Sequence, residues 1–293
     1  MLPNVICPGF QKAGTTYLFR LLRQHPEIFL PKSKELHFFS QPSVRRRGVA
    51  HYERFFREHT KEPVVMEITP RYISSESYII DMRNVLGPDI QFIVMVRDPI
   101  KRLISHHRMR RSKGKGTLSL NEVIKRGLQD CGNTYLDQVK RGMYSEQLTL
   151  LEKHFSRDNI LIVVMEKFIK ERHGSLEQIL EFLQIDKTFG FNLNQPRNAG
   201  KGAQVNLWGR VYYYFPPRYR RLILNFLPED FESSFEKYLF NQKKPLPEEK
   251  IDGDLLKELL TIYANEKEIL RSKYGLEEED LLQGDQTIGD IPY

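Results

Sequence analysis

Short apolar runs rich in β-branched residues recur along this chain and predict buried strands. They lie at residues 5–7, 64–66, 90–96 and 160–165, and in each the apolar positions are largely continuous rather than alternating with polar ones. Continuous runs are typical of parallel strands that are covered on both faces. The pattern therefore predicts a parallel sheet.

Between these runs, apolar residues return three or four positions apart, which is the spacing of one helical face. Leu18, Leu21 and Leu22 follow the first run, and further sets lie within 148–155, 176–183 and 254–271. Alternating strands and helices predict an α/β fold, a P-loop-like open parallel sheet flanked by helices on both faces. In such a fold, ligands bind at the carboxyl ends of the strands.

Two polar stretches, 41–60 and 106–118, interrupt the pattern and are rich in Arg, Lys, Gly and Ser. We interpret residues 108–115 as a solvated loop; the alternative is a basic rim that attracts an anionic acceptor. The sequence shows no internal repeat and no clear linker. We therefore expect residues 1–293 to form a single domain, with an acidic tail at 276–293 on its surface.

The segment 9–16, GFQKAGTT, joins the first predicted strand to the first predicted helix. A strand, a glycine loop and a helix in this order turn backbone N–H groups and the positive end of a helix dipole toward an anion. Gly9, Gly14 and Thr16 fit the frame of a Walker A motif, but Thr15 stands where that motif has its lysine. Lys12 is the only lysine of the loop. We expect a site for a phosphate-like group; the alternative is an ordinary glycine turn.

A second anion site is predicted where the third run ends. Asp98 suits the N-cap of a new helix and Pro99 its first position. Arg97 then lies at the carboxyl edge of the sheet, beside the glycine loop if the two strands are neighbours. Its forked N–H donors and the hydroxyl of Ser105 suit a second phosphate. The alternative is that Arg97 pairs with a nearby carboxylate and Ser105 is a small packed residue.

Net charge and composition limit the kinds of partner and compartment that are expected. The formal net charge of +7 favours an anionic partner or substrate without choosing its class. Cys7 and Cys131 are the two cysteines, and we expect both to be free thiols of a reducing compartment. No run approaches the roughly 18 apolar residues of a membrane span, so a cytoplasmic protein is expected if residue 1 is the natural start. No clustered set of Cys, His and Asp is present, and we expect no metal.

These residues together resemble a known family. The segments PGFQKAGTT and VRDPxxRxxS, in this order and at this spacing, resemble the sulfotransferases that use 3′-phosphoadenosine 5′-phosphosulfate as donor. Residues 34–39, KELHFF, and 67–70, EITP, resemble the branch that sulfates heparan sulfate and related glycans. The resemblance runs from about residue 4 to 185 and implies a sulfotransferase fold with a hydroxyl-bearing acceptor, most simply a carbohydrate.

The resemblance also implies a role for each matching residue. The donor's 5′-phosphosulfate would be held by Gln11, Lys12, Ala13, Gly14, Thr15 and Thr16. Arg97 and Ser105 would bind its 3′-phosphate, and the weaker match at Lys201 and Gly202 would close over the nucleotide. Glu35 would be the general base, His37 would support it, and Lys12 would stabilise the leaving phosphate of the product, adenosine 3′,5′-bisphosphate.

Two features separate the chain from the glycan-modifying branch. Members of that branch are usually anchored in the Golgi and have a further lysine where this chain has Ile68. We therefore expect a bacterial or otherwise cytoplasmic type with another acceptor.

A P-loop kinase is an alternative that predicts binding of ATP with Mg²⁺. A non-catalytic nucleic-acid-binding module is another, but the basic residues are scattered and form no recognised motif, so no nucleic-acid partner is expected.

Overall fold

The computed structural model describes residues 1–112, 117–129, 138–194 and 249–276. The described residues belong to two compact units. The first holds residues 1–102, 140–194 and 260–276, and the second holds the remaining described residues. The single domain that the sequence predicts stays a prediction, and residues 277–293 of the expected acidic tail lie outside the described part of the chain.

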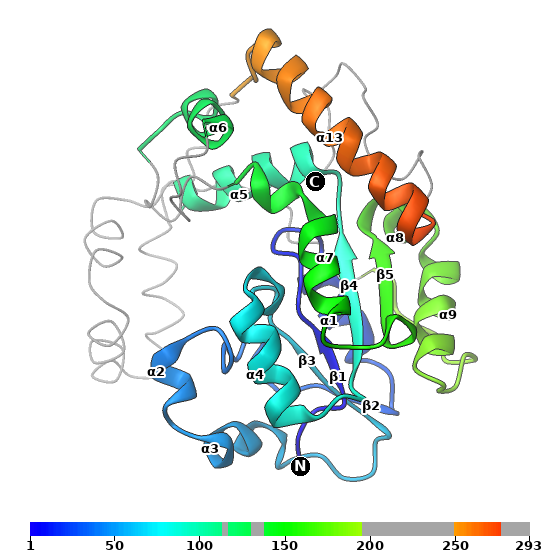
Figure 1. Cartoon of the computed structure of the whole chain (residues 1–293). Coiled ribbons are helices and arrows are strands. Elements are labelled where there is room, and N and C mark those ends of the chain that lie inside the picture. Colours follow the sequence, from blue (N-terminus) through cyan, green and yellow to red (C-terminus); the bar gives the residue numbers. More distant parts are fainter. Residues whose placement is uncertain (113–116, 130–137, 195–248, 277–293) are drawn as a thin grey trace, which may run out of the picture. The chain divides into compact units, whose positions relative to one another are not determined.

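The first unit contains a five-stranded sheet (Figure 1). Its strands are β1 (Val5–Cys7), β2 (Ile28–Phe29), β3 (Val64–Ile68), β4 (Gln91–Val96) and β5 (Ile160–Val164). They lie in the order β2-β3-β1-β4-β5, and every neighbouring pair is parallel. The predicted parallel sheet is thus confirmed, with one short strand, β2, that the apolar pattern did not indicate.

Helices connect the strands and cover the sheet. In the first unit they are α1 (Thr15–Leu22), α2 (Pro42–Arg45), α3 (Val49–Glu53), α4 (Glu76–Leu86), α7 (Tyr144–Glu152), α8 (Met165–Lys170) and α9 (Arg172–Phe182). The chain leaves β1 through α1 toward one edge of the sheet, and it passes through α4 and α7 toward the other edge. Because crossovers between parallel strands are right-handed, opposite directions place α1 on one face and α4 and α7 on the other.

Short 3₁₀ helices occupy several connections of the first unit. They lie at Arg54–Phe56, Tyr72–Ser74, Lys140–Gly142 and Arg157–Asn159. The core beneath all these elements consists of the strands themselves and the apolar faces of the helices. Every residue of β1 and β3 is buried, which explains why their sequences are almost entirely apolar. Glu67 in β3 is the exception.

Two further helices, α5 (Pro99–Ser112) and α13 (Gly253–Tyr274), each pass from one unit into the other, and α6 (Leu120–Leu128) belongs to the second. The loop interpretation of 108–115 is wrong for its first half, because α5 continues to Ser112. Arg and Met are good helix formers, so this charged stretch extends the helix instead of ending it. Glu249 pairs with His107 at 3.0 Å and with Arg111, which places charged partners around the end of α5.

Candidate active site

The glycine loop follows β1 and is tied to the neighbouring strand β4. The N–H of Phe10 donates to the carbonyl of Met95 at 2.7 Å, and the N–H of Met95 donates to the carbonyl of Gly9 at 2.9 Å. Since β1 and β4 are adjacent and parallel, these bonds extend the ladder beyond the end of β1. The loop therefore leaves the carboxyl edge of the sheet in a fixed position.

Both glycines of the loop are required by their surroundings. A Cβ atom on Gly9 would lie 2.5 Å from the side chain of Ile73. Gly14 has φ 87°, in the left-handed region that favours glycine, and a Cβ there would lie 3.0 Å from the sulfur of Met165. Lys12 is also left-handed, with φ 74°, although it is not a glycine. The chain thus accepts backbone strain at the one lysine of the loop.

Helix α1 starts where the loop ends, with Gly14 at its N-cap. Among the described residues no side chain caps this terminus. The first N–H groups of any helix lack intrahelical partners, and together with the helix dipole they form a ready anion site. Thr15 and Ala13 are buried, whereas Gln11, Lys12 and Thr16 are half-buried. An uncapped helix terminus thus follows the loop, and the binding of a phosphate-like group there stays a prediction.

Arg97 lies beside the glycine loop, as predicted. One of its terminal nitrogens donates to the carbonyl oxygen of Lys12 at 3.2 Å, and its own carbonyl accepts from the hydroxyl of Tyr144 at 2.7 Å. Its Nε atom is buried and has no hydrogen-bond partner in the described part of the chain. A buried guanidinium nitrogen without an acceptor, next to an uncapped helix terminus, fits a doubly charged anion such as a phosphate group.

Glu166 approaches the same guanidinium and realises the alternative that Arg97 pairs with a carboxylate. Its Oε1 lies 3.7 Å from Nε of Arg97, and its Oε2 accepts from the N–H of Asp98 at 3.3 Å. Burial raises the pKa of the Glu166 carboxyl to about 7, against the opposing effect of Arg97. The sequence analysis missed Glu166; its position directly after β5, at the same sheet edge, was the available signal.

The helix start at Asp98 is confirmed. Its carboxylate accepts from the N–H of Lys101 at 2.8 Å, which is the bond of an N-cap, and Pro99 is the first residue of α5. Ser105 is half-buried in α5 and belongs to the second unit, so its role at the 3′-phosphate stays a prediction. Lys201, Gly202 and Cys131 lie outside the described residues. Cys7 is a free, buried thiol, and burial raises its pKa to about 12.

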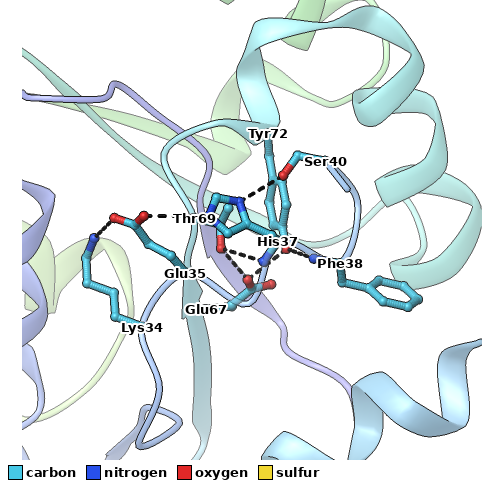
Figure 2. A network of polar contacts seen from close by, with 8 residues as sticks. All are labelled: Lys34, Glu35, His37, Phe38, Ser40, Glu67, Thr69 and Tyr72. Carbon is cyan, nitrogen blue, oxygen red and sulfur yellow. Dashed lines mark hydrogen bonds and ion pairs between the residues drawn. The ribbon is translucent and has the colours of Figure 1, made fainter. Parts of the chain in front are cut away.

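The candidate base Glu35 is anchored on the strand next to β1. Its N–H donates to the carbonyl of Ile68 at 3.2 Å, and Ile68 pairs with Cys7 in the sheet. Its half-exposed carboxylate lies between two cationic or potentially cationic groups (Figure 2). The Lys34 ammonium donates to Oε1 at 2.6 Å, and Nε2 of His37 lies 3.7 Å from Oε2. The structure therefore brings Glu35 and His37 together, and it adds Lys34, to which the sequence analysis gave no role.

His37 is neutral near pH 7. Partial burial lowers its pKa below the usual 6.5, and the charges of Arg71 and Lys34 act in the same direction, whereas Glu35 opposes them. Its Nδ1 lies 3.1 Å from the hydroxyl of Ser40. A neutral imidazole has one N–H, and a proton on Nε2 would point toward the Glu35 carboxylate. His37 can therefore orient this carboxylate without adding a charge.

Glu67 forms a second polar cluster below this pair. It is 1% exposed, lies in β3, and accepts from Thr69 at 2.6 Å, from Tyr72 at 2.8 Å and from the hydroxyl of Tyr52. Burial raises the pKa of its carboxyl. The sequence analysis quoted Glu67 only as part of a motif; a glutamate inside an apolar run was the signal that a buried network exists.

The described residues contain neither a metal-binding cluster nor a membrane-spanning helix. Over residues 1–112, 117–129, 138–194 and 249–276, no group of three or more His, Cys, Asp and Glu side chains is placed to hold a metal ion. In the same ranges, no helix has both the length and the apolar character needed to cross a bilayer.

Comparison with known proteins decides the family. A family model described as "Sulfotransferase domain" matches residues 2–195, which include the glycine loop, Glu35, Arg97 and Glu166. The chain belongs to the sulfotransferase domain family. A solved sulfotransferase structure from Alicyclobacillus acidocaldarius shares the fold, with a TM-score of 0.70 and 19% identity, covering 95% of this chain and 98% of that one. The predicted fold class and family resemblance are thereby confirmed.

Two relatives of known activity are similar in sequence. One is the human heparan sulfate glucosamine 3-O-sulfotransferase 6, which is 28% identical over 207 residues. The other is the mouse heparan sulfate glucosamine 3-O-sulfotransferase 3B1, which is 30% identical over 200 residues. The matches cover 69% and 65% of this chain, but only 59% and 50% of the two relatives. The chain thus spans little more than half of the proteins it resembles.

Proposed function

We propose that this protein transfers a sulfuryl group from 3′-phosphoadenosine 5′-phosphosulfate to a hydroxyl group of a carbohydrate. The single observation that carries the proposal is the position of Arg97. Its guanidinium bonds to the carbonyl of Lys12, and its buried Nε has no hydrogen-bond acceptor in the described part of the chain, with the Glu166 carboxylate 3.7 Å away. This provides a cationic site beside the glycine loop, as a donor with two separate phosphate groups requires.

Each residue at the carboxyl edge of the sheet would have its own part in the transfer reaction. The amides at the start of α1, with Gln11, Ala13, Thr15 and Thr16, would hold the phosphosulfate, and the Lys12 ammonium would stabilise negative charge on the leaving phosphate. Glu35 would accept the proton of the attacking hydroxyl, a task that contributes about 10²–10⁴-fold to rates. Lys34 and His37 would keep its carboxylate oriented.

A carbohydrate acceptor is supported by the relatives and by residues 34–39. Both similar enzymes act on heparan sulfate according to their names, and KELHFF and EITP are the segments that resemble the glycan-sulfating branch. The side chain of Glu35 is half-exposed, so the hydroxyl group of an acceptor could reach its carboxylate.

Calorimetric titration with adenosine 3′,5′-bisphosphate tests the donor site directly. We expect tight binding without a metal ion, at least tenfold weaker binding of AMP, and loss of the difference in Arg97→Ala because the 3′-phosphate then lacks its partner. Lys101→Ala serves as control, since it removes a neighbouring cation from α5. Stronger binding of ATP in the presence of Mg²⁺ would instead assign the loop to a kinase.

A further inference from the structure

The segment that carries the candidate base is held through its backbone by the end of β3. Four consecutive N–H groups, those of residues 35–38, donate to groups at this end or just after it. The N–H of Glu35 bonds to the carbonyl of Ile68, and that of Leu36 bonds to the Glu67 carboxylate. The next two donate to hydroxyl groups of Thr69 and Tyr72 (Figure 2).

The orientation of these two hydroxyl groups is explained by Glu67. An amide N–H can only donate, so Thr69 must accept from His37 at 3.5 Å and Tyr72 must accept from Phe38 at 2.8 Å. Each hydroxyl has a single proton of its own, and in both cases Glu67 is the acceptor, at 2.6 Å and 2.8 Å. The carboxylate therefore orients both hydroxyl groups toward the segment.

The segment needs such support because its backbone is strained. Glu35 has φ 63° and His37 has φ 56°, both in the left-handed region that side chains other than glycine disfavour. Conformations of this kind persist only where the surrounding structure holds them in place. Here they determine where the Glu35 carboxylate and the His37 ring point.

We propose that Glu67 is a positioning residue of the active site, whose buried carboxylate fixes residues 35–38 through Thr69, Tyr72 and the N–H of Leu36. The inference rests on the proposed function, in which Glu35 accepts the acceptor proton. An apolar residue at this position would serve a purely structural strand equally well, as at Val65 and Met66 in the same strand. Burial of a carboxylate is unfavourable unless its hydrogen bonds are used.

Glu67→Gln tests this role because it keeps the shape of the side chain and replaces one hydrogen-bond acceptor with a donor. The amide group brings two N–H donors to a place where Tyr52, Thr69, Tyr72 and Leu36 already donate. The amide oxygen has only two lone pairs, so at least one of the three groups that join Glu67 to the segment, the hydroxyls of Thr69 and Tyr72 and the N–H of Leu36, must lose its acceptor. We expect kcat to fall about 10²-fold, since small misplacement of a reacting group has that effect, and the affinity for adenosine 3′,5′-bisphosphate to stay unchanged.

Two tyrosines of the cluster provide a matched pair of milder variants. Tyr72→Phe and Tyr52→Phe each remove one buried hydroxyl that donates to Glu67. Only the hydroxyl of Tyr72 also accepts from a segment amide, that of Phe38. We therefore expect Tyr72→Phe to lower kcat and Tyr52→Phe to leave it near the wild-type value. Glu266→Gln is a further control, because Glu266 is a buried carboxylate that binds Ser145 instead.

Two readouts are used on the full chain. Transfer of labelled sulfuryl group from the donor is measured with heparosan and with p-nitrophenol as hydroxyl probes. Hydrogen exchange is measured on the peptide that contains residues 35–38, and it requires no acceptor. We expect faster exchange of this peptide in Glu67→Gln and Tyr72→Phe, and no change in Tyr52→Phe and Glu266→Gln.

The outcomes separate this inference from the proposed function. Unchanged exchange in folded Glu67→Gln and Tyr72→Phe would overturn the positioning role, as would faster exchange without loss of kcat. An equal loss of rate in Tyr72→Phe and Tyr52→Phe would also overturn it, because the cluster would then be merely structural. A wild-type protein that neither binds the bisphosphate nor transfers sulfuryl would overturn the proposed function, and the exchange measurement would still decide whether Glu67 holds the segment.

Discussion

Lys12 combines a strained backbone conformation with a candidate role in the transfer reaction. It is left-handed, with φ 74°, and its carbonyl accepts from Arg97 at 3.2 Å, so its backbone joins the two halves of the candidate donor site. A residue other than glycine in this conformation costs roughly 1–2 kcal/mol. This cost indicates that a lysine side chain at this position serves function rather than stability.

Substitutions of Lys12 separate these two effects. Lys12→Ala keeps the strained backbone and removes the cation, whereas Lys12→Gly removes both the cation and the strain. We expect transfer to be lost in both variants, and the free energy of unfolding to be about 1 kcal/mol higher in Lys12→Gly than in Lys12→Ala. Urea unfolding and a transfer assay measure the two quantities. Near-normal turnover of Lys12→Ala would show that the loop cation has no part in transfer.

Under the proposed function, in which Arg97 binds the 3′-phosphate, we expect Glu166 to make this binding dependent on pH. Its pKa of about 7 means that it is largely neutral at pH 6 and charged at pH 8.5, where it competes with a phosphate for Arg97. We expect Glu166→Gln to bind adenosine 3′,5′-bisphosphate about tenfold more tightly than wild type at pH 8.5, the equivalent of one pKa unit, and equally at pH 6. Calorimetry at both pH values measures this.

The phosphate itself has a second pKa near 6. Comparing the wild type with Glu166→Gln at the same pH cancels the effect of this ionisation on binding. AMP, which lacks the 3′-phosphate, is the control ligand and should not distinguish the variants. Weaker binding by Glu166→Gln at pH 8.5 would show the opposite role, in which the carboxylate orients the Arg97 guanidinium for its ligand.

Among the elements, the start of α5 links the sheet edge to the anion site. Asp98 caps this helix through the N–H of Lys101, and its own N–H donates to Glu166. We expect Asp98→Ala to lower the free energy of unfolding by about 1 kcal/mol because the cap is lost, and Asp98→Asn to be nearly neutral because asparagine caps equally well. Urea unfolding of the two variants checks this, and equal losses would show that charge, not capping, is what matters at Asp98.

Elements with a strong local signal were predicted well from the sequence. The runs around β1, β3, β4 and β5 are apolar over several residues, and the cap at Asp98 and Pro99 involves neighbouring residues only. Strand β2 has two residues and depends on pairing with β3, which no local pattern contains. The end of α5 was misjudged because its arginines were interpreted as a solvated loop although arginine favours helices.

The candidate site shows the same limit. The loop and Arg97 were predicted because two parallel strands bring their ends to one edge. Glu166 and the contacts of Glu67 depend on partners far apart in the chain, such as Tyr52, which lies 15 residues before Glu67. A single sequence contains no record of these pairings, so only the unusual glutamate within an apolar strand hinted at them.

At the scale of the whole molecule, the buried carboxyl group of Glu166 makes stability change around neutral pH. Burial raises its pKa to about 7, so near this pH the folded state holds a proton that the unfolded chain has already released. For such groups, stability is fully present below the unfolded pKa and is lost as the pH rises through the folded one. Groups with a lowered pKa, such as Glu62 at about 2, lose their contribution only in acid.

Relative to Glu166→Gln, we therefore expect the free energy of unfolding of the wild type to fall between pH 6.5 and pH 8.5. This comparison cancels His37 and His107, whose lowered pKa makes stability rise over the same range in both proteins. The pKa of Glu166, about 7, lies in this window, and the loss should be about 1 kcal/mol. Urea unfolding at three pH values in this range measures it, below the usual thiol pKa of 9.0 that would involve Cys7. Glu62→Gln should show the same dependence on pH as the wild type. Equal dependence in the wild type and Glu166→Gln would mean that Glu166 is ionised throughout this range and is held by Arg97, and the expected pH dependence of bisphosphate binding would then be absent as well.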